Sequence, residues 1–182
     1  ESVPRPEYKD LLLKRKDLLL LTPEAPSLLI DEFPDGLEGG VDFEGSIRLA
    51  GLVPRSTSVH QGGSLWLDYY WEALDNLDTD LYMKVFFVDS FGRPPLKQGY
   101  PVWFQNHELG ARVFPTSQWA PGDKVRESYL SIVPRQVPPG IYHLLAQLYE
   151  SADQTQILRP SRETGDQSVV LGQVTVTKRT WR

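Results

Sequence analysis

The chain has 182 residues, enough for one domain with a sizeable core and an extension. Its formal net charge of −5 argues against nucleic acid as a partner, because phosphate binding needs a basic surface. The sequence contains no cysteine, which excludes disulfides, thiol catalysis and thiolate zinc sites.

Residues 1–40 are rich in proline and leucine and are interpreted as an N-terminal arm. A short helix over residues 8–21 is one interpretation, since prolines bound it on both sides. Exposed leucines are unfavourable in water, so we expect the arm to be buried against its own domain. The alternatives are that it docks on another chain or leads from a membrane anchor. The residues expected at this contact are Leu18, Leu19, Leu20, Leu21, Leu28, Leu29 and Ile30.

From residue 45 onward, the apolar pattern has the period of two that is typical of strands. The Pro-Gly pairs at Pro121-Gly122 and Pro139-Gly140 each precede such a run. The pattern predicts seven to nine strands and no helix after residue 40. We therefore expect residues 41–182 to form an all-β, antiparallel, immunoglobulin-like sandwich. Strands are predicted around residues 47–49, 65–71, 81–89, 102–104, 124–133, 140–149, 156–158 and 169–177.

Four motifs follow one another in a fixed order. A strand ending in Tyr70-Trp71 precedes an Asp-x-x-Gly turn at residues 89–92, a Pro-Thr-x-x-Trp-x-Pro-Gly motif at residues 115–122 and a Pro-Gly-x-Tyr strand at residues 139–142. This order resembles the extracytoplasmic β-sandwich modules of bacterial surface proteins and of polytopic glycosyltransferase-like membrane proteins. The resemblance covers roughly residues 45–177. It implies a periplasmic or cell-surface location, an accessory role and a membrane-anchored neighbour.

The sequence shows no motif that carries catalysis. The three histidines, His60, His107 and His143, lack the spacing of a metal site, and His107 is expected in a polar loop. There is no Gly-x-Ser-x-Gly turn and no glycine-rich phosphate loop. A hydrolase with a pair of carboxylates is a minority hypothesis without specific support. We expect a protein that is not an enzyme and that has no cofactor or metal.

Aromatic residues are the main candidates for binding. Trp71 and Trp119 are expected to fill the core or to fix a turn. Exposed rings could instead stack on sugars or anchor a protein interface, and the alternative is that they pack at the core edge or under the arm. The four surface candidates are Trp66, Tyr70, Trp103 and Phe104.

The sequence therefore predicts a non-enzymatic structural or assembly module that contacts other protein subunits, another copy of the chain included. Its expected mechanism is the addition of the extended arm to a sheet edge, either of its own domain or of a neighbour. The alternative is a carbohydrate-binding accessory module with a polysaccharide as its ligand.

Overall fold

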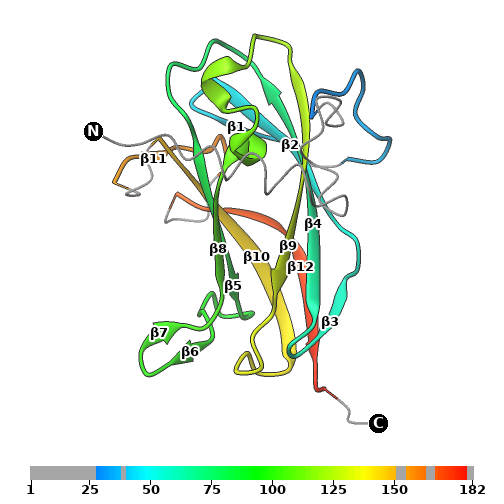
Figure 1. Ribbon diagram of the computed structural model, residues 1–182. Coiled ribbons are helices and arrows are strands. Elements are labelled where there is room, and N and C mark those ends of the chain that lie inside the picture. The colour runs from blue at the N-terminus through cyan, green and yellow to red at the C-terminus, as the bar shows by residue number, and fades with distance from the viewer. Residues whose placement is uncertain (1–27, 38–39, 151–154, 163–166, 180–182) are drawn as a thin grey trace, which may run out of the picture.

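The computed structural model describes residues 28–37, 40–150, 155–162 and 167–179, and this part of the chain is a β-sandwich (Figure 1). One sheet, sheet A, has the strand order β1-β2-β4-β9. Every neighbouring pair in it is antiparallel. Its strands are β1 (Val41–Phe43), β2 (Ile47–Pro54), β4 (Ser64–Ala73) and β9 (Lys124–Ile132).

The second sheet, sheet B, has the order β3-β12-β10-β5-β8, and β11 also pairs with β10. Its pairs are antiparallel except for β3 and β12, which run parallel. Its strands are β3 (Ser58–His60), β5 (Tyr82–Val88), β8 (Phe104–Glu108), β10 (Gly140–Tyr149), β11 (Ile157–Leu158) and β12 (Val169–Thr177). The remaining elements are the hairpin of β6 (Leu96–Lys97) and β7 (Tyr100–Pro101) and the 3-10 turns η1 (Leu109–Arg112) and η2 (Thr116–Gln118).

The predicted fold class, an all-β antiparallel sandwich, is confirmed. Seven strands of the described chain have five or more residues. Of the five shorter ones, β11 was predicted and the other four, β1, β3, β6 and β7, were not. One boundary was wrong, because the strand expected around residues 102–104 lies at Phe104–Glu108. It therefore includes His107, which was expected in a loop. Neither described helical turn is long enough to cross a bilayer.

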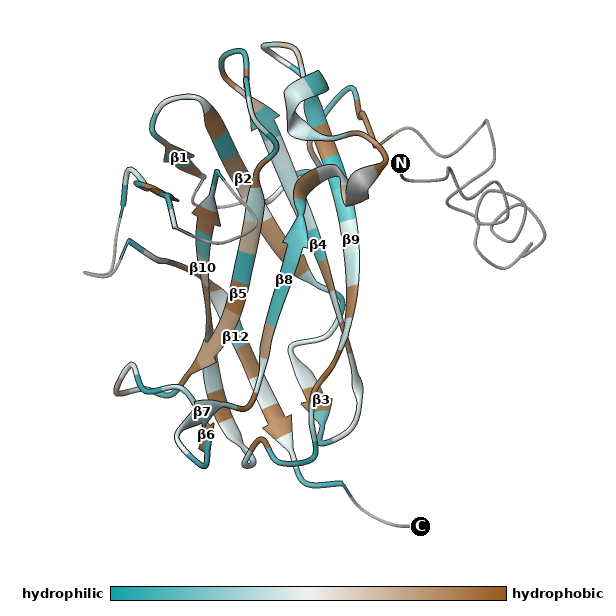
Figure 2. Cartoon of the chain, turned by 60° about the vertical axis from the view of Figure 1, so that its left-hand side comes forward, coloured by the Kyte–Doolittle hydropathy of each residue, from teal (hydrophilic) through white to brown (hydrophobic). Residues whose placement is uncertain are grey.

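Side chains of β4 show how the period of two builds the core. Leu65, Leu67, Tyr69 and Trp71 point between the sheets and are fully buried, as the alternation predicted. Figure 2 shows the same alternation of apolar and polar positions along several strands. The core between the sheets therefore depends on one face of each long strand.

The Pro-Thr-x-x-Trp motif has a structural role: it fixes a turn, as predicted for its tryptophan. The Trp119 indole is buried and its Nε1 donates to the carbonyl of Phe114 at 2.9 Å. The Thr116 hydroxyl is also buried; it accepts from the Leu81 N–H at 2.8 Å and donates to the Thr79 carbonyl at 2.9 Å. These bonds fix the loop before β9 to the start of β5.

A buried carboxylate, Glu127 on β9, links the two sheets. One carboxylate oxygen accepts from Trp71 Nε1 of β4 at 2.9 Å, and the other accepts from the Gly110 N–H of η1 at 2.8 Å. His107 of β8, in sheet B, places its Nε2 3.5 Å from the first oxygen. Burial, and then the negative charge of Glu127, raise the pKa of Tyr69 well above its usual value, so this phenol stays neutral. The carboxylate thus faces polar groups from three elements: β4, η1 and β8.

The His107 ring fills the space between the sheets beside this carboxylate. It stacks on Tyr129 with ring centroids 3.7 Å apart and lies 5.5 Å from the Tyr69 ring. Neither ring nitrogen makes a hydrogen bond within the described residues. The imidazole therefore acts here as a packed ring whose Nε2 faces Glu127.

Replacing Glu127 should destabilise the sandwich more than most single changes. Glu127→Ala leaves the Trp71 and Gly110 donors buried without an acceptor, so we expect a loss of about 2–4 kcal/mol in the free energy of unfolding. Urea unfolding followed by tryptophan fluorescence measures this. As a control, Asp78→Ala in an exposed turn should stay within about 0.5 kcal/mol of the wild type. Equal stability of the two variants would show that Glu127 does not link the sheets.

Candidate functional site

The described part of the arm pairs with β9, the edge strand of sheet A in the same chain, through an isolated bridge. The Ile30 N–H donates to the Lys124 carbonyl and the Arg126 N–H donates to the Leu28 carbonyl, both at 2.8 Å. Leu29 lies opposite Val125 in an antiparallel bridge. Leu28 packs against the core, whereas Leu29 stays exposed, so the predicted burial holds for only part of this run. The predicted contact residues Leu18, Leu19, Leu20 and Leu21 lie outside the described residues.

Beyond this bridge, the arm crosses the outer face of sheet A. The Phe33 ring meets Tyr70 edge-on, with centroids 6.4 Å apart. Leu37 lies over Gly51 so closely that a Cβ added to this glycine would come within 2.9 Å of the leucine side chain. Glycine at this position on β2 therefore lets the arm lie flat on the sheet.

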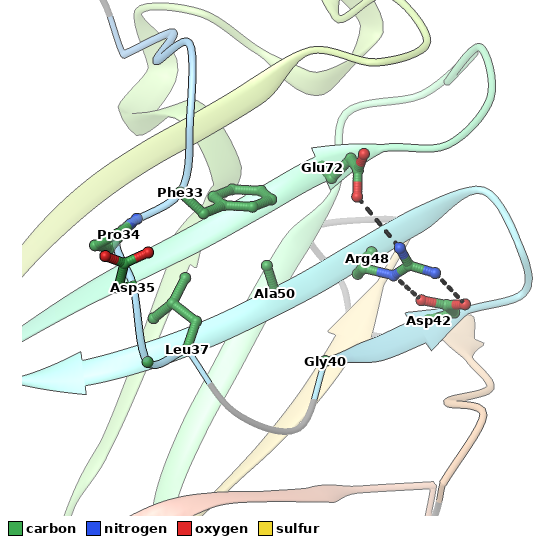
Figure 3. Close-up of a pocket in the computed structure, with 10 residues that line it drawn as sticks. Phe33, Pro34, Asp35, Leu37, Gly40, Asp42, Arg48, Ala50 and Glu72 are labelled. Carbon is green, nitrogen blue, oxygen red and sulfur yellow. Dashed lines mark hydrogen bonds and ion pairs between the residues drawn. The ribbon is translucent and has the colours of Figure 1, made fainter.

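An open depression of about 610 Å³ lies between the arm and β2 (Figure 3). In it, the Arg48 guanidinium donates to both oxygens of Asp42, at 2.6 and 3.1 Å, and to Glu72 at 3.3 Å. The hydrogen bond from Arg48 lowers the pKa of Asp42 below its usual value. This guanidinium is already paired with two carboxylates. We therefore interpret the depression as the polar part of the contact between the arm and sheet A.

A second charged cluster surrounds Asp68, which lies on the outer side of β4 but is 5 % exposed. Arg55 donates to both carboxylate oxygens, at 3.2 and 3.1 Å, and Arg126 donates at 3.4 Å. The Ser128 hydroxyl also donates to this carboxylate. Burial alone would raise the pKa of Asp68, but the hydrogen bonds from Arg55 and Ser128 and the charge of Arg126 outweigh it and lower the pKa.

Four exposed apolar side chains extend from this cluster along the part of sheet A that the described arm leaves uncovered. We call them the apolar row, and their exposed fractions run from 37 % to 55 %. Trp66 on β4 is directly opposite Leu130 on β9, and the Arg55 guanidinium lies 4.6 Å from the Trp66 ring centre. The members of the row are Val53, Trp66, Leu130 and Ile132.

The four aromatic candidates do not form one platform. Trp103 is only 3 % exposed, because it stacks on Phe87 at 4.1 Å within the sandwich, so its predicted surface position was wrong. Tyr70 is 7 % exposed under Phe33, which corresponds to the alternative that it packs under the arm. Trp66 is exposed on sheet A, whereas Phe104, 51 % exposed, lies on β8 of sheet B.

Sequence reasoning missed most of the apolar row. Leu130 and Ile132 occupy outward positions of β9, since the alternate residues Val125 and Glu127 are buried between the sheets. Apolar residues at the outward positions of a strand are the signal that would have identified them. Within the described residues, no group of three or more histidine and acidic side chains is placed to hold a metal.

The Asp68 cluster should make stability depend on acid pH. Because the folded-state pKa of Asp68 is lowered, its contribution is present above the unfolded value near 3.8 and is lost as pH falls through the folded value. When the pH is lowered from about 5 to about 2, the free energy of unfolding should fall less in Asp68→Asn than in the wild type. Urea titrations across this range measure the difference. The control Asp78→Asn should keep the wild-type pH dependence, and an equally steep loss in Asp68→Asn would contradict the assignment.

No family model matches this sequence, and no curated protein does. Among solved structures, the C-terminal domain of Wzt is similar, with a TM-score of 0.51, 13 % identity and coverage of 77 % of this chain and 78 % of that one. The CARDB domain of a Pyrococcus furiosus protein gives a TM-score of 0.39 at 10 % identity, covering 77 % and 96 %. A Niemann-Pick type C2 protein from the Japanese carpenter ant gives 0.43 at 9 % identity, covering 80 % and 98 %. The likeness to the Wzt domain concerns the fold alone, and the other two are too distant to support an argument. The chain is thus a β-sandwich module that is similar in fold to the C-terminal domain of Wzt.

Proposed function

We propose that this chain is a non-enzymatic structural or assembly module of an extracytoplasmic protein and that it binds other protein subunits through the outer face of sheet A. The observation that carries the proposal is the apolar row beside the Asp68 cluster. Trp66 stands at its centre with Arg55 against its ring. Tryptophan and arginine are the residue types that most often dominate protein interfaces, with polar groups at the rim.

The arm supports the same surface. Residues 28–37 of the arm already lie on sheet A, held by backbone hydrogen bonds to β9 and by the Phe33 and Leu37 contacts. This sheet therefore has an edge and a face that accept extended, apolar protein segments. The extracytoplasmic location rests on the resemblance of residues 45–177 to modules of surface and membrane proteins.

Carbohydrate binding is the less favoured function, because its aromatic platform is not assembled. Trp66 and Phe104 lie on different sheets, and a sugar cannot stack on both. One side of the Trp66 ring is also occupied by Arg55. A hydrolase is less favoured again, since the two buried carboxylates of the described chain, Asp68 and Glu127, are each held by hydrogen-bond donors.

Photo-crosslinking in the organism that makes the protein tests the proposed surface. A photoreactive amino acid at Val53, in the apolar row, should give covalent adducts with protein. The matched control is Val170, which is exposed on β12 of sheet B and should give far fewer adducts. Adducts at neither position, or equal adducts at both, would contradict the proposal. If a glycan array gives binding that Trp66→Ala removes, the carbohydrate alternative replaces it.

A further inference from the structure

Among the described residues, the edge of β9 is divided into a half covered by the arm and a half without a partner strand. The Lys124 carbonyl accepts a hydrogen bond from the arm and the Arg126 N–H donates one to it. The backbone groups of the even-numbered residues of β9 therefore face this edge. The odd-numbered backbone groups face β4, as the bonds that Val133 exchanges with Gly62 and Gly63 at the same side illustrate. Ser128, Leu130 and Ile132 therefore turn their N–H and C=O groups to the edge. Within the described residues, these groups have no strand partner there.

The sequence of the arm before Leu28 is unsuited to extend this pairing toward Ser128. Leu28 pairs with Arg126, so the next arm residue that would face β9 in the same register is Pro26, opposite Ser128. Proline has no N–H, and its ring obstructs a strand partner at a hydrogen-bonding position. An arm that continued in this register would offer Ser128 no N–H donor.

The open half is also the uncharged half. Lys124 and Arg126 lie on the half that pairs with the arm, whereas residues 128–132 read Ser-Tyr-Leu-Ser-Ile. Natural sheets usually protect such an edge with charges, prolines or bulges, and residues 128–132 have none of these. The exposed Leu130 and Ile132 side chains border the same edge. This segment can face its own copy without placing like charges opposite each other.

We infer that residues Ser128–Ile132 pair antiparallel with the same residues of a second copy, which joins the two sheets A into one continuous sheet. Under twofold symmetry, Leu130 lies opposite Leu130 of the second copy, and Ser128 lies opposite Ile132. The backbone groups that face the edge then hydrogen-bond in pairs, and the two apolar rows meet on one face. The inference rests on the proposed function and names its partner as another copy of this chain.

The arm limits how far the second copy can shift toward the start of β9. Sliding the pair by two residues toward the start of β9 would bring Arg126 opposite Leu130 and would press against residues 28–30, whose backbone is bonded to Lys124 and Arg126. The arm therefore restricts pairing to the uncharged segment. An edge limited in this way gives a closed dimer, because each copy offers one such segment to the other.

Charge swapping at Leu130 tests the pairing. Leu130 is exposed, so Leu130→Lys and Leu130→Glu should both fold, which circular dichroism can verify. Sedimentation velocity of the full chain between about 1 μM and about 500 μM should show a dimer for the wild type. Each charged variant should dissociate at least about tenfold more readily, because two like charges face each other. An equimolar mixture of the two variants should recover the dimer.

The control is Ile141→Lys, a change of the same kind at an exposed position on β10 of sheet B, which should leave the dimer intact. Hydrogen exchange gives a second readout: the amides of Ser128, Leu130 and Ile132 should become protected as concentration rises, while the Arg126 amide is protected throughout. A wild type that stays monomeric over this range, or a dimer that Leu130→Lys leaves unchanged, would overturn the inference. If either of these outcomes is found but the photoreactive group at Val53 gives adducts with a different protein, the dimer is excluded and the proposed function is retained.

Discussion

A single buried carboxylate holds the edge of the sandwich on which the arm and the candidate surface depend. Glu127 accepts hydrogen bonds from Trp71 and Gly110 and faces His107, so it connects β9, β4, η1 and β8. A carboxylate removed from water needs these partners, and losing any of them would leave it poorly compensated. This requirement keeps β9 fixed against sheet B while its outer side and its edge remain available.

The outer side of β9 and β4 is organised by a second set of charges. Asp68 gathers Arg55, Arg126 and Ser128, which come from segments on both sides of β4. Phe33 covers Tyr70 on one side of this cluster, and the apolar row lies on the other. The face is thus divided into a part covered by the arm and a part open to partners, with a paired charge cluster between them.

The fold and the proposed function of this protein rest on different observations. The sandwich is shared with the C-terminal domain of Wzt at low identity, and such a scaffold carries many unrelated functions. The proposed contact surface rests instead on side chains of this chain, above all Trp66 and Leu130. Burial likewise separates Trp103, a core residue just before β8, from the rings that reach solvent.

Much of the fold could be predicted, because the alternation of apolar and polar residues in β4, β9, β10 and β12 indicates which residues face the core. Short strands such as β1 and β3 were missed, since three residues carry too little pattern. The site was predicted less well. Phe33 and Tyr70 are far apart in the sequence, and only their contact makes Tyr70 a buried residue.

By itself, the sequence determined the all-β sandwich and the core tryptophans Trp71 and Trp119, because these follow from local periodicity and composition. The tertiary structure decided which outward residues stay exposed, which edge the arm covers and which charges are paired. These depend on contacts between segments distant in the chain, for which a single sequence carries no local signal.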